Sequence, residues 1–286
     1  WWFSVPLVSP LQVIWAIGWS MVLLSVLVRF LPVRAVLAVG ILIVAGHNLL
    51  DPVSARSLGA WGPVWLIVHE RGPLFWNGEI VGIVAYPLLA WFGIMALGYG
   101  LGPLFVSPQR DRSLVKLGLG MLAVFFVLRW LNHSGAPRPW VAQPTTVQTL
   151  MAFFDVQKYP PSLLYVCATL APMLLLVPVF ERLRGVPSTI LRTFGSVPLM
   201  AYVGHLYVLH LVAIALYAAT GRNLDGMFNT IHDIFIAPQV FAGTSFPLAA
   251  VYSAWLGVLA ILYPLCRWWS GVKRRRREWW LSYLWR

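Results

Sequence analysis

Several histidine and aspartate side chains of this sequence could accept a proton during catalysis. In the stretch GHNLLDP, His47 and Asp51 are four residues apart, so a helix would carry both on one face. Pro52 disfavours helix at the residue before it, which predicts that Asp51 lies at a helix end. Imidazole and carboxylate groups are common general acids and bases. We therefore take His47 and Asp51 as catalytic candidates.

A second pair of histidines lies inside the apolar stretch VPLMAYVGHLYVLHLV. An ionisable group within a membrane span is costly and normally faces the protein interior or a water-filled cavity. His205 and His210 are five residues apart, about 140° around a helix, so they do not converge on one ion and we expect no metal site. One of them is a candidate base or proton relay, and the other is expected to bond Tyr202 or Tyr207. Alternatively, at least one of the two is a structural histidine whose hydrogen bonds are satisfied within the protein core.

The stretch FFDVQKYPPSLLY places polar groups directly ahead of another apolar run. Its double proline, 160–161, suits the first turn of a helix, which would leave the 162–163 amides free for an anion or oxyanion. Alternatively, Lys158 reaches the lipid headgroups and pairs with Asp155. The substrate-binding candidates are Asp155, Lys158, Tyr159, Asn48 and His69.

The composition requires a membrane environment around these groups. Of 286 residues, 59% are hydrophobic and 10% charged, and the mean hydropathy is +0.76, which excludes a water-soluble surface. About seven windows are long enough to cross a bilayer as helices, and they do not alternate in polarity as barrel strands do. These windows are 11–30, 33–50, 83–104, 114–131, 162–180, 197–219 and 247–268. We predict an all-α polytopic transmembrane helical bundle, forming a single domain over 1–286, with short interfacial helices such as 145–157.

Small residues in these windows predict how the helices pack. Gly98 and Gly102 in GYGLG have the GxxxG spacing typical of close helix contacts. Cys167 and Cys266 both fall within predicted spans. This placement favours buried free thiols over a disulfide framework.

The net charge of +12 is distributed unevenly between the two sides of the predicted bundle. By the positive-inside rule, the side with more Lys and Arg, which includes the C-terminus, is cytoplasmic. Basic residues on that side could bind phosphates, although topology alone accounts for them; they are Arg110, Arg112, Lys116, Arg182, Arg184 and Arg192. The final run VKRRRREWWLSYLWR predicts an anchor on anionic lipid, and we expect no nucleic-acid partner.

Five stretches carry a family resemblance: GHNLLD, YPLLAWFGIMALGYGLG, FFDVQKYPPSLLYVCATLAP, FGSVPLMAYVGHLYVLH and YPLCRWWSGVKRRRREWWLSYL. Together they resemble the bacterial branch of the heparan-alpha-glucosaminide N-acetyltransferase catalytic-domain family. The resemblance implies a bacterial inner-membrane enzyme that transfers acetyl from cytosolic acetyl-CoA to an amino sugar or glycan on the periplasmic side. For the phosphates of this donor, the candidate binding residues are Arg110, Arg112 and Arg184. Family members begin with further spans that carry a histidine. This chain begins at Trp1 without a counterpart, so we expect a fragment.

Three functions remain open from the sequence. An acyltransferase needs a base, donors for the oxyanion and a path for the thioester. A proton-coupled transporter or flippase of a polar lipid or sugar would use the intramembrane histidines equally well. A structural membrane subunit fits the composition but gives these histidines no purpose. We expect the acyltransferase, working in the lipid bilayer, with a homodimer left open.

Overall fold

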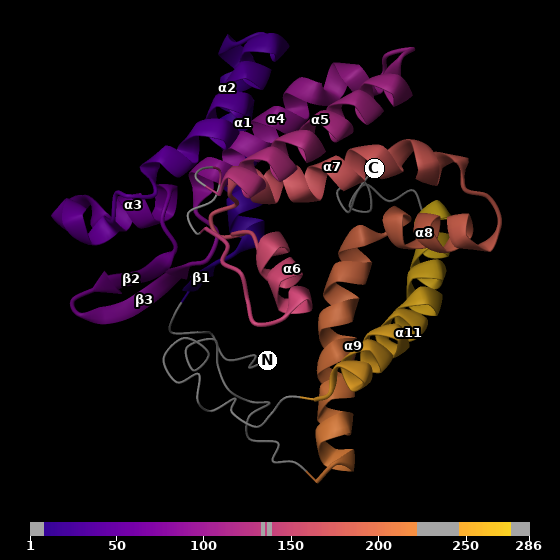
Figure 1. The fold of residues 1–286 in the computed structure, drawn as a ribbon. Coiled ribbons are helices and arrows are strands. Elements are labelled where there is room, and N and C mark those ends of the chain that lie inside the picture. Colours follow the sequence, from indigo (N-terminus) through magenta and orange to yellow (C-terminus); the bar gives the residue numbers. More distant parts are fainter. Residues whose placement is uncertain (1–8, 133–134, 136–138, 222–245, 276–286) are drawn as a thin grey trace. The chain divides into compact units, whose positions relative to one another are not determined.

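The computed structural model describes residues 9–132, 135, 139–221 and 246–275. The chain separates into two compact units, Leu7–Glu181 and Arg182–Arg286 with Trp1–Pro6, and each is described by itself (Figure 1). Seven helices of the described part are long and apolar enough to cross a membrane, which confirms the all-α polytopic bundle and the seven predicted spans. They are α1 (Val13–Phe30), α2 (Val33–Gly46, extended by η1, His47–Leu50), α4 (Leu88–Phe105), α5 (Arg110–Leu131), α7 (Leu163–Arg182), α9 (Pro198–Ala219) and α11 (Leu248–Arg275).

In the first unit, α2 packs closely along α4 because glycines remove side chains from the contact. A methyl group at Gly40 of α2 would collide with the backbone of α4 at Ala96 and Leu97. A methyl group at Gly100 of α4 would lie 2.6 Å from the Cα atom of Leu37. The prediction that 98 and 102 are the packing glycines is wrong, since a methyl group at either would meet nothing within 4 Å. Gly100, halfway between them, lies on the face that meets α2.

The segment between α2 and α4 has structure of its own. It holds η2 (Ala55–Trp61), α3 (Gly62–Val68) and the strands β2 (Gly72–Trp76) and β3 (Glu79–Val84). The hairpin turn is Asn77–Gly78, and both residues have positive φ, 50° and 84°, the conformation that favours Asn-Gly between paired strands. β1 (Ser9–Leu11) pairs in parallel with β3, which gives the sheet order β1-β3-β2.

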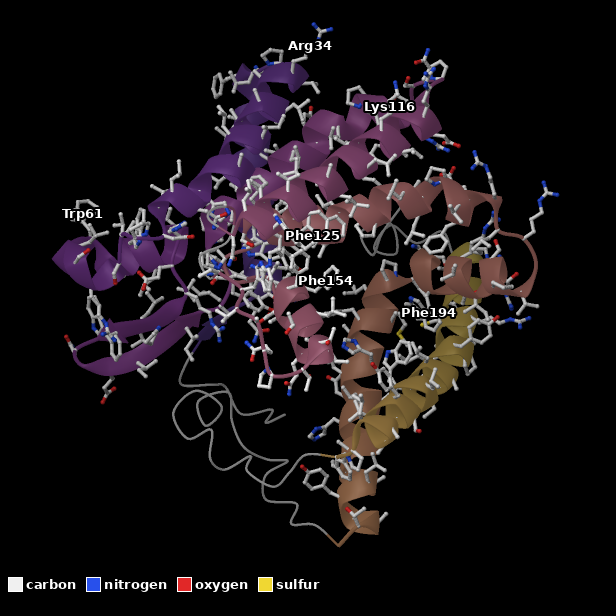
Figure 2. The ribbon with its side chains drawn as sticks, viewed as in Figure 1. Arg34, Trp61, Lys116, Phe125, Phe154 and Phe194 are labelled. Atoms are coloured by element: carbon white, nitrogen blue, oxygen red, sulfur yellow. The ribbon has the colours of Figure 1, made fainter. Side chains whose placement is uncertain are left out.

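Helix α6 (Thr146–Phe154) confirms the short helix predicted over 145–157. The Thr145 hydroxyl caps it by accepting a hydrogen bond from the amide of Gln148 at 3.2 Å. Phe154 of α6 stacks on Phe125 of α5, with ring centroids 6.0 Å apart (Figure 2). Arg129 of α5, only 2% exposed, donates to the carbonyls of Phe153, Ala152 and Asp155 at 2.6, 2.8 and 2.8 Å. A guanidinium thus satisfies the carbonyls at the end of α6.

The second unit consists of α8 (Val186–Ser196), α9 and α11 among its described residues. α11 packs against both α8 and α9, and Phe194 of α8 lies with its ring centroid 6.2 Å from that of Tyr263 (Figure 2). Cys266 of α11, like Cys167 of α7 in the first unit, is buried and free. The prediction of buried thiols without a disulfide is therefore confirmed.

Candidate functional site

A buried polar cluster lies at the end of α2, where the helix tightens into the 3₁₀ turn η1. His47 and His69 are each 3% exposed. Nε2 of His69 lies 3.1 Å from Oδ1 of Asp51, and Nδ2 of Asn48 donates to Oδ2 of the same carboxylate at 3.0 Å. His69 directly follows α3, so the chain between η1 and α3 folds back to bring the imidazole onto the carboxylate. Asp51 lies at the helix end that the proline after it predicts.

The hydrogen bonds identify Nε2 as the donor nitrogen of each imidazole. Nε2 of His47 lies 2.9 Å from the carbonyl oxygen of Pro161; a carbonyl only accepts, so Nε2 donates and the neutral ring keeps its lone pair on Nδ1. Nε2 of His69 likewise donates to the carboxylate of Asp51. In the described part of the chain, both Nδ1 atoms are buried without a hydrogen-bond partner. These two Nδ1 atoms belong to rings whose centroids are 5.7 Å apart.

The surroundings of Asp51 keep its carboxylate charged. Burial alone raises the pKa of Asp51, but hydrogen bonds from His69 and Asn48 outweigh it and hold that pKa below its ordinary value. A carboxylate that accepts the Nε2 proton also stabilises positive charge on the imidazole. Asp51 thus orients the ring of His69.

The segment before α7 forms hydrogen bonds with the cluster, although the bonded residues are more than 110 positions apart in the sequence. Besides the bond from His47 to Pro161, Oδ1 of Asn48 accepts from the amide of Leu163 at 3.0 Å. The amide of Ser162 donates to the carbonyl of Gln157 at 3.0 Å. The prediction of free 162–163 amides is therefore wrong, because local and long-range acceptors occupy both. The double proline also precedes α7 rather than forming its first turn.

Tyr159 and Lys158, two of the predicted substrate-binding residues, lie together on the same segment. The hydroxyls of Tyr159 and Tyr86 are 3.1 Å apart, and the Tyr159 ring lies beneath the cations of Lys158 and Arg71, at 5.1 and 5.6 Å. Burial raises the pKa of Tyr159, but hydrogen bonds to Tyr86 and Lys158 outweigh it and lower the pKa. Hydrogen bonding to Tyr159 raises the pKa of Lys158. This environment favours a charged lysine.

The predicted pairing of Lys158 with Asp155 is not among the ion pairs of the described residues. The side chain of Asp155 is exposed, and its backbone carbonyl accepts from Arg129. Asp155 therefore contributes to the end of α6, whereas Lys158 contributes to the group around Tyr159.

The remaining predicted residues lie elsewhere. His205 and His210 are half-buried on α9, in the second unit, and the ring of His205 contacts Tyr202 at 5.4 Å between centroids. Arg110 pairs with the carboxylates of Asp111 and Glu181. Arg112 and Arg184 are exposed, one in each unit. The structure brings together His47, Asn48, Asp51 and His69, and the predicted roles of these and of the other residues stay predictions.

Three residues of this region were missed from the sequence. Tyr86 and Arg71 contact Tyr159, and the indole Nε1 of Trp91 is buried without a partner in the described part of the chain, with its ring 5.3 Å from that of Tyr86. Arg71 is two residues after His69, a spacing that could have drawn attention to it. Nothing in the pattern around Tyr86 and Trp91 distinguishes them from other interfacial aromatics.

His47, Asp51 and His69 each offer one ligand atom within 4.8 Å of the others, a spacing that a divalent ion such as Zn²⁺ could share. Both carboxylate oxygens of Asp51 already accept hydrogen bonds, from His69 and from Asn48. The Nδ1 atoms of His47 and His69 have no partner in the described part of the chain, so the cluster can accept a hydrogen bond or hold such an ion.

No family model matches the chain, and comparisons with curated proteins and with solved structures found no match. The family resemblance carried by the sequence motifs stays a prediction. The functional argument therefore rests on the geometry of the cluster at the end of α2.

Proposed function

We propose that the chain is a multi-pass membrane acyltransferase whose acceptor is activated at the end of α2. One observation carries the proposal: Asp51 holds Nε2 of buried His69 at 3.1 Å, while Nδ1 of the same ring is buried and has no partner among the described residues. A base whose second nitrogen is oriented by a carboxylate is the arrangement used to activate nucleophiles.

The reaction assigns a role to each group of the cluster. Nδ1 of His69 takes a proton from the amine or hydroxyl of the acceptor as the acceptor attacks the acyl carbonyl. The new bond to the acceptor forms, the bond from the acyl carbon to the thiol breaks, and the thiol leaves with the proton. Asp51 acts as a positioning residue by stabilising the imidazolium. His47 offers a second unprotonated nitrogen for another polar group of the acceptor.

The group around Tyr159 supplies positive charge beside the cluster, whose charged carboxylate is Asp51. Lys158 and Arg71 flank the Tyr159 ring, on the segment that supplies the Pro161 carbonyl to His47. We assign this group to binding of the polar acceptor, for example a glycan. Following the family resemblance, the donor is acetyl-CoA, the membrane is the bacterial inner membrane, the C-terminus is cytoplasmic and the acceptor is periplasmic.

The test uses membranes that contain the full-length protein, labelled acetyl-CoA and a panel of amino sugars and glycans. Transfer of label to an acceptor is expected with the wild type, and His69→Gln should lower the rate by about 100-fold or more. Asp51→Asn should lower kcat with little change in KM, because Asp51 touches the base and not the acceptor. Glu79→Gln in the exposed hairpin is the control and should keep the full rate.

Two outcomes would contradict the proposed acyltransferase activity at this cluster. Movement of an unmodified solute, driven by a proton gradient and lost in His69→Gln, would support the transporter instead. Equal rates of acetyl transfer in His69→Gln and Glu79→Gln would remove this cluster from the reaction.

A further inference from the structure

The second unit contains a cavity of about 830 Å³, a volume within the range of ligand pockets, roughly 300 to 1,000 Å³. It is lined by α8, by the start of α9 and by the C-terminal part of α11. Four of its lining side chains are cations: Arg192, Arg267, Lys273 and Arg274. The lining also includes the hydroxyl residues Thr189, Thr193, Ser196 and Ser270.

No carboxylate of the described part of this unit balances these cations. Residues 182–221 and 246–275 contain basic side chains but neither Asp nor Glu. Arg110 in the first unit, by contrast, is paired with two carboxylates. Like charges gathered in one cavity repel each other, and a bound anion would relieve that repulsion.

Hydrogen bonds join the elements that form the cavity. The hydroxyls of Ser196, at the end of α8, and Ser270, on α11, are 3.1 Å apart. Nζ of Lys273 donates to the carbonyl of Ser196 at 3.3 Å. These bonds connect α8 and α11 directly, so the arginines on the two helices are held around the same space.

We propose that this cavity binds a phosphate-bearing ligand through Arg192, Arg267, Lys273 and Arg274. Guanidinium groups bind phosphate through two parallel hydrogen bonds, and hydroxyls add further donors. The volume exceeds what one free phosphate needs, which favours a diphosphate or a phosphate carried on a larger group. Two sources share this chemistry: the headgroup of an acidic phospholipid and a soluble phosphorylated cofactor.

The position of the cavity agrees with either source. The charge distribution predicts that this end of α11 lies on the cytoplasmic side, where basic pockets between spanning helices bind anionic headgroups. None of the lining residues belongs to the cluster at the end of α2. The inference goes beyond the proposed function and does not depend on it.

The test compares full-length proteins purified in a neutral detergent. One arm measures the binding and the thermal stabilisation produced by pyrophosphate. The other reconstitutes the protein in nanodiscs of phosphatidylcholine with or without phosphatidylglycerol and measures unfolding. The variant Arg192→Gln/Arg267→Gln removes two cavity cations. Arg29→Gln/Arg34→Gln is the matched control, because it makes the same charge change at exposed positions of the first unit on the same predicted membrane side.

In at least one arm, the cavity variant is expected to lose stabilisation and to bind roughly tenfold or more weakly, while the control keeps both. Loss in the pyrophosphate arm assigns a soluble ligand, and loss only with phosphatidylglycerol assigns a lipid. Arg192→Lys/Arg267→Lys should restore part of the binding, which separates loss of charge from misfolding. Equal behaviour of the cavity and control variants in both arms would overturn the proposal.

Discussion

Nε2 of His69 lies 3.1 Å from Oδ1 of Asp51, although the two residues are eighteen positions apart in the chain. The contact exists because Asp51 and His69 directly follow the short helices η1 and α3, and the segment between these helices folds back. Asn48 holds the second carboxylate oxygen from within η1. Hydrogen bonds to both oxygens fix the orientation of the Asp51 carboxylate. The carboxylate in turn fixes the orientation of the His69 ring.

Replacing Asp51 by Asn should destabilise the protein by about 1.5 to 3 kcal/mol, the usual contribution of hydrogen bonds to a charged group. The amide would place a donor opposite either Nδ2 of Asn48 or Nε2 of His69, so one of the two hydrogen bonds is lost. Denaturant titration in detergent measures the free energy of unfolding. Glu79→Gln, on the exposed hairpin, should change it by less than about 0.5 kcal/mol. A similar loss in both variants would contradict the role given to this carboxylate.

The same carboxylate predicts a specific dependence of stability on pH. Burial raises the pKa of Asp51, but hydrogen bonds from His69 and Asn48 lower it more, so the folded state binds the proton less readily than the unfolded state. The contribution of Asp51 to the free energy of unfolding is complete above the ordinary aspartate pKa, near pH 4, and is lost as the pH falls through the lowered value. Unfolding measured between pH 6 and pH 2 should show a steeper decline in the wild type than in Asp51→Asn. Parallel curves would contradict this prediction.

Replacing Arg129 by Leu should loosen α6. The guanidinium donates to three backbone carbonyls around the end of α6, and each carbonyl left without a donor costs about 1 to 3 kcal/mol. Amide hydrogen exchange should become faster over Thr146–Phe154. Arg112→Leu, at an exposed position of the same helix α5, is the control and should leave exchange in α6 unchanged. Unaltered exchange in the Arg129 variant would mean that water replaces the guanidinium without cost.

Gly40→Ala should push α2 away from α4, because the new methyl group would collide with the backbone of α4. Overpacking of this kind costs about 1 to 3 kcal/mol. Gly98→Ala is the matched control; its methyl group meets nothing within 4 Å, so it should be neutral or stabilising by up to about 1 kcal/mol. The measurement is thermal unfolding of both variants in the same detergent. If Gly98→Ala were the less stable variant, Gly98 rather than Gly40 would be the glycine required for close helix packing.

The spanning helices could be predicted because a run of apolar residues determines them locally. The hairpin could not be predicted from hydropathy, yet Asn77–Gly78 between β2 and β3 is a strong turn signal that identifies it afterwards. His47 and Asp51 were selected by their helical spacing, but the structure pairs Asp51 with His69 instead, a contact that depends on how a connecting segment folds back. The amide of Leu163 was expected to be free; its partner Asn48 is 115 positions away, which local pattern cannot reveal.

The bond from Nε2 of His47 to the carbonyl of Pro161 joins α2 to the residues that introduce α7. Sliding these helices past each other by one turn, 5.4 Å, would break that bond and release the imidazole to rotate or to change its tautomer. The orientation of the His47 imidazole therefore depends on the axial register of two helices that are each long and apolar enough to cross a membrane.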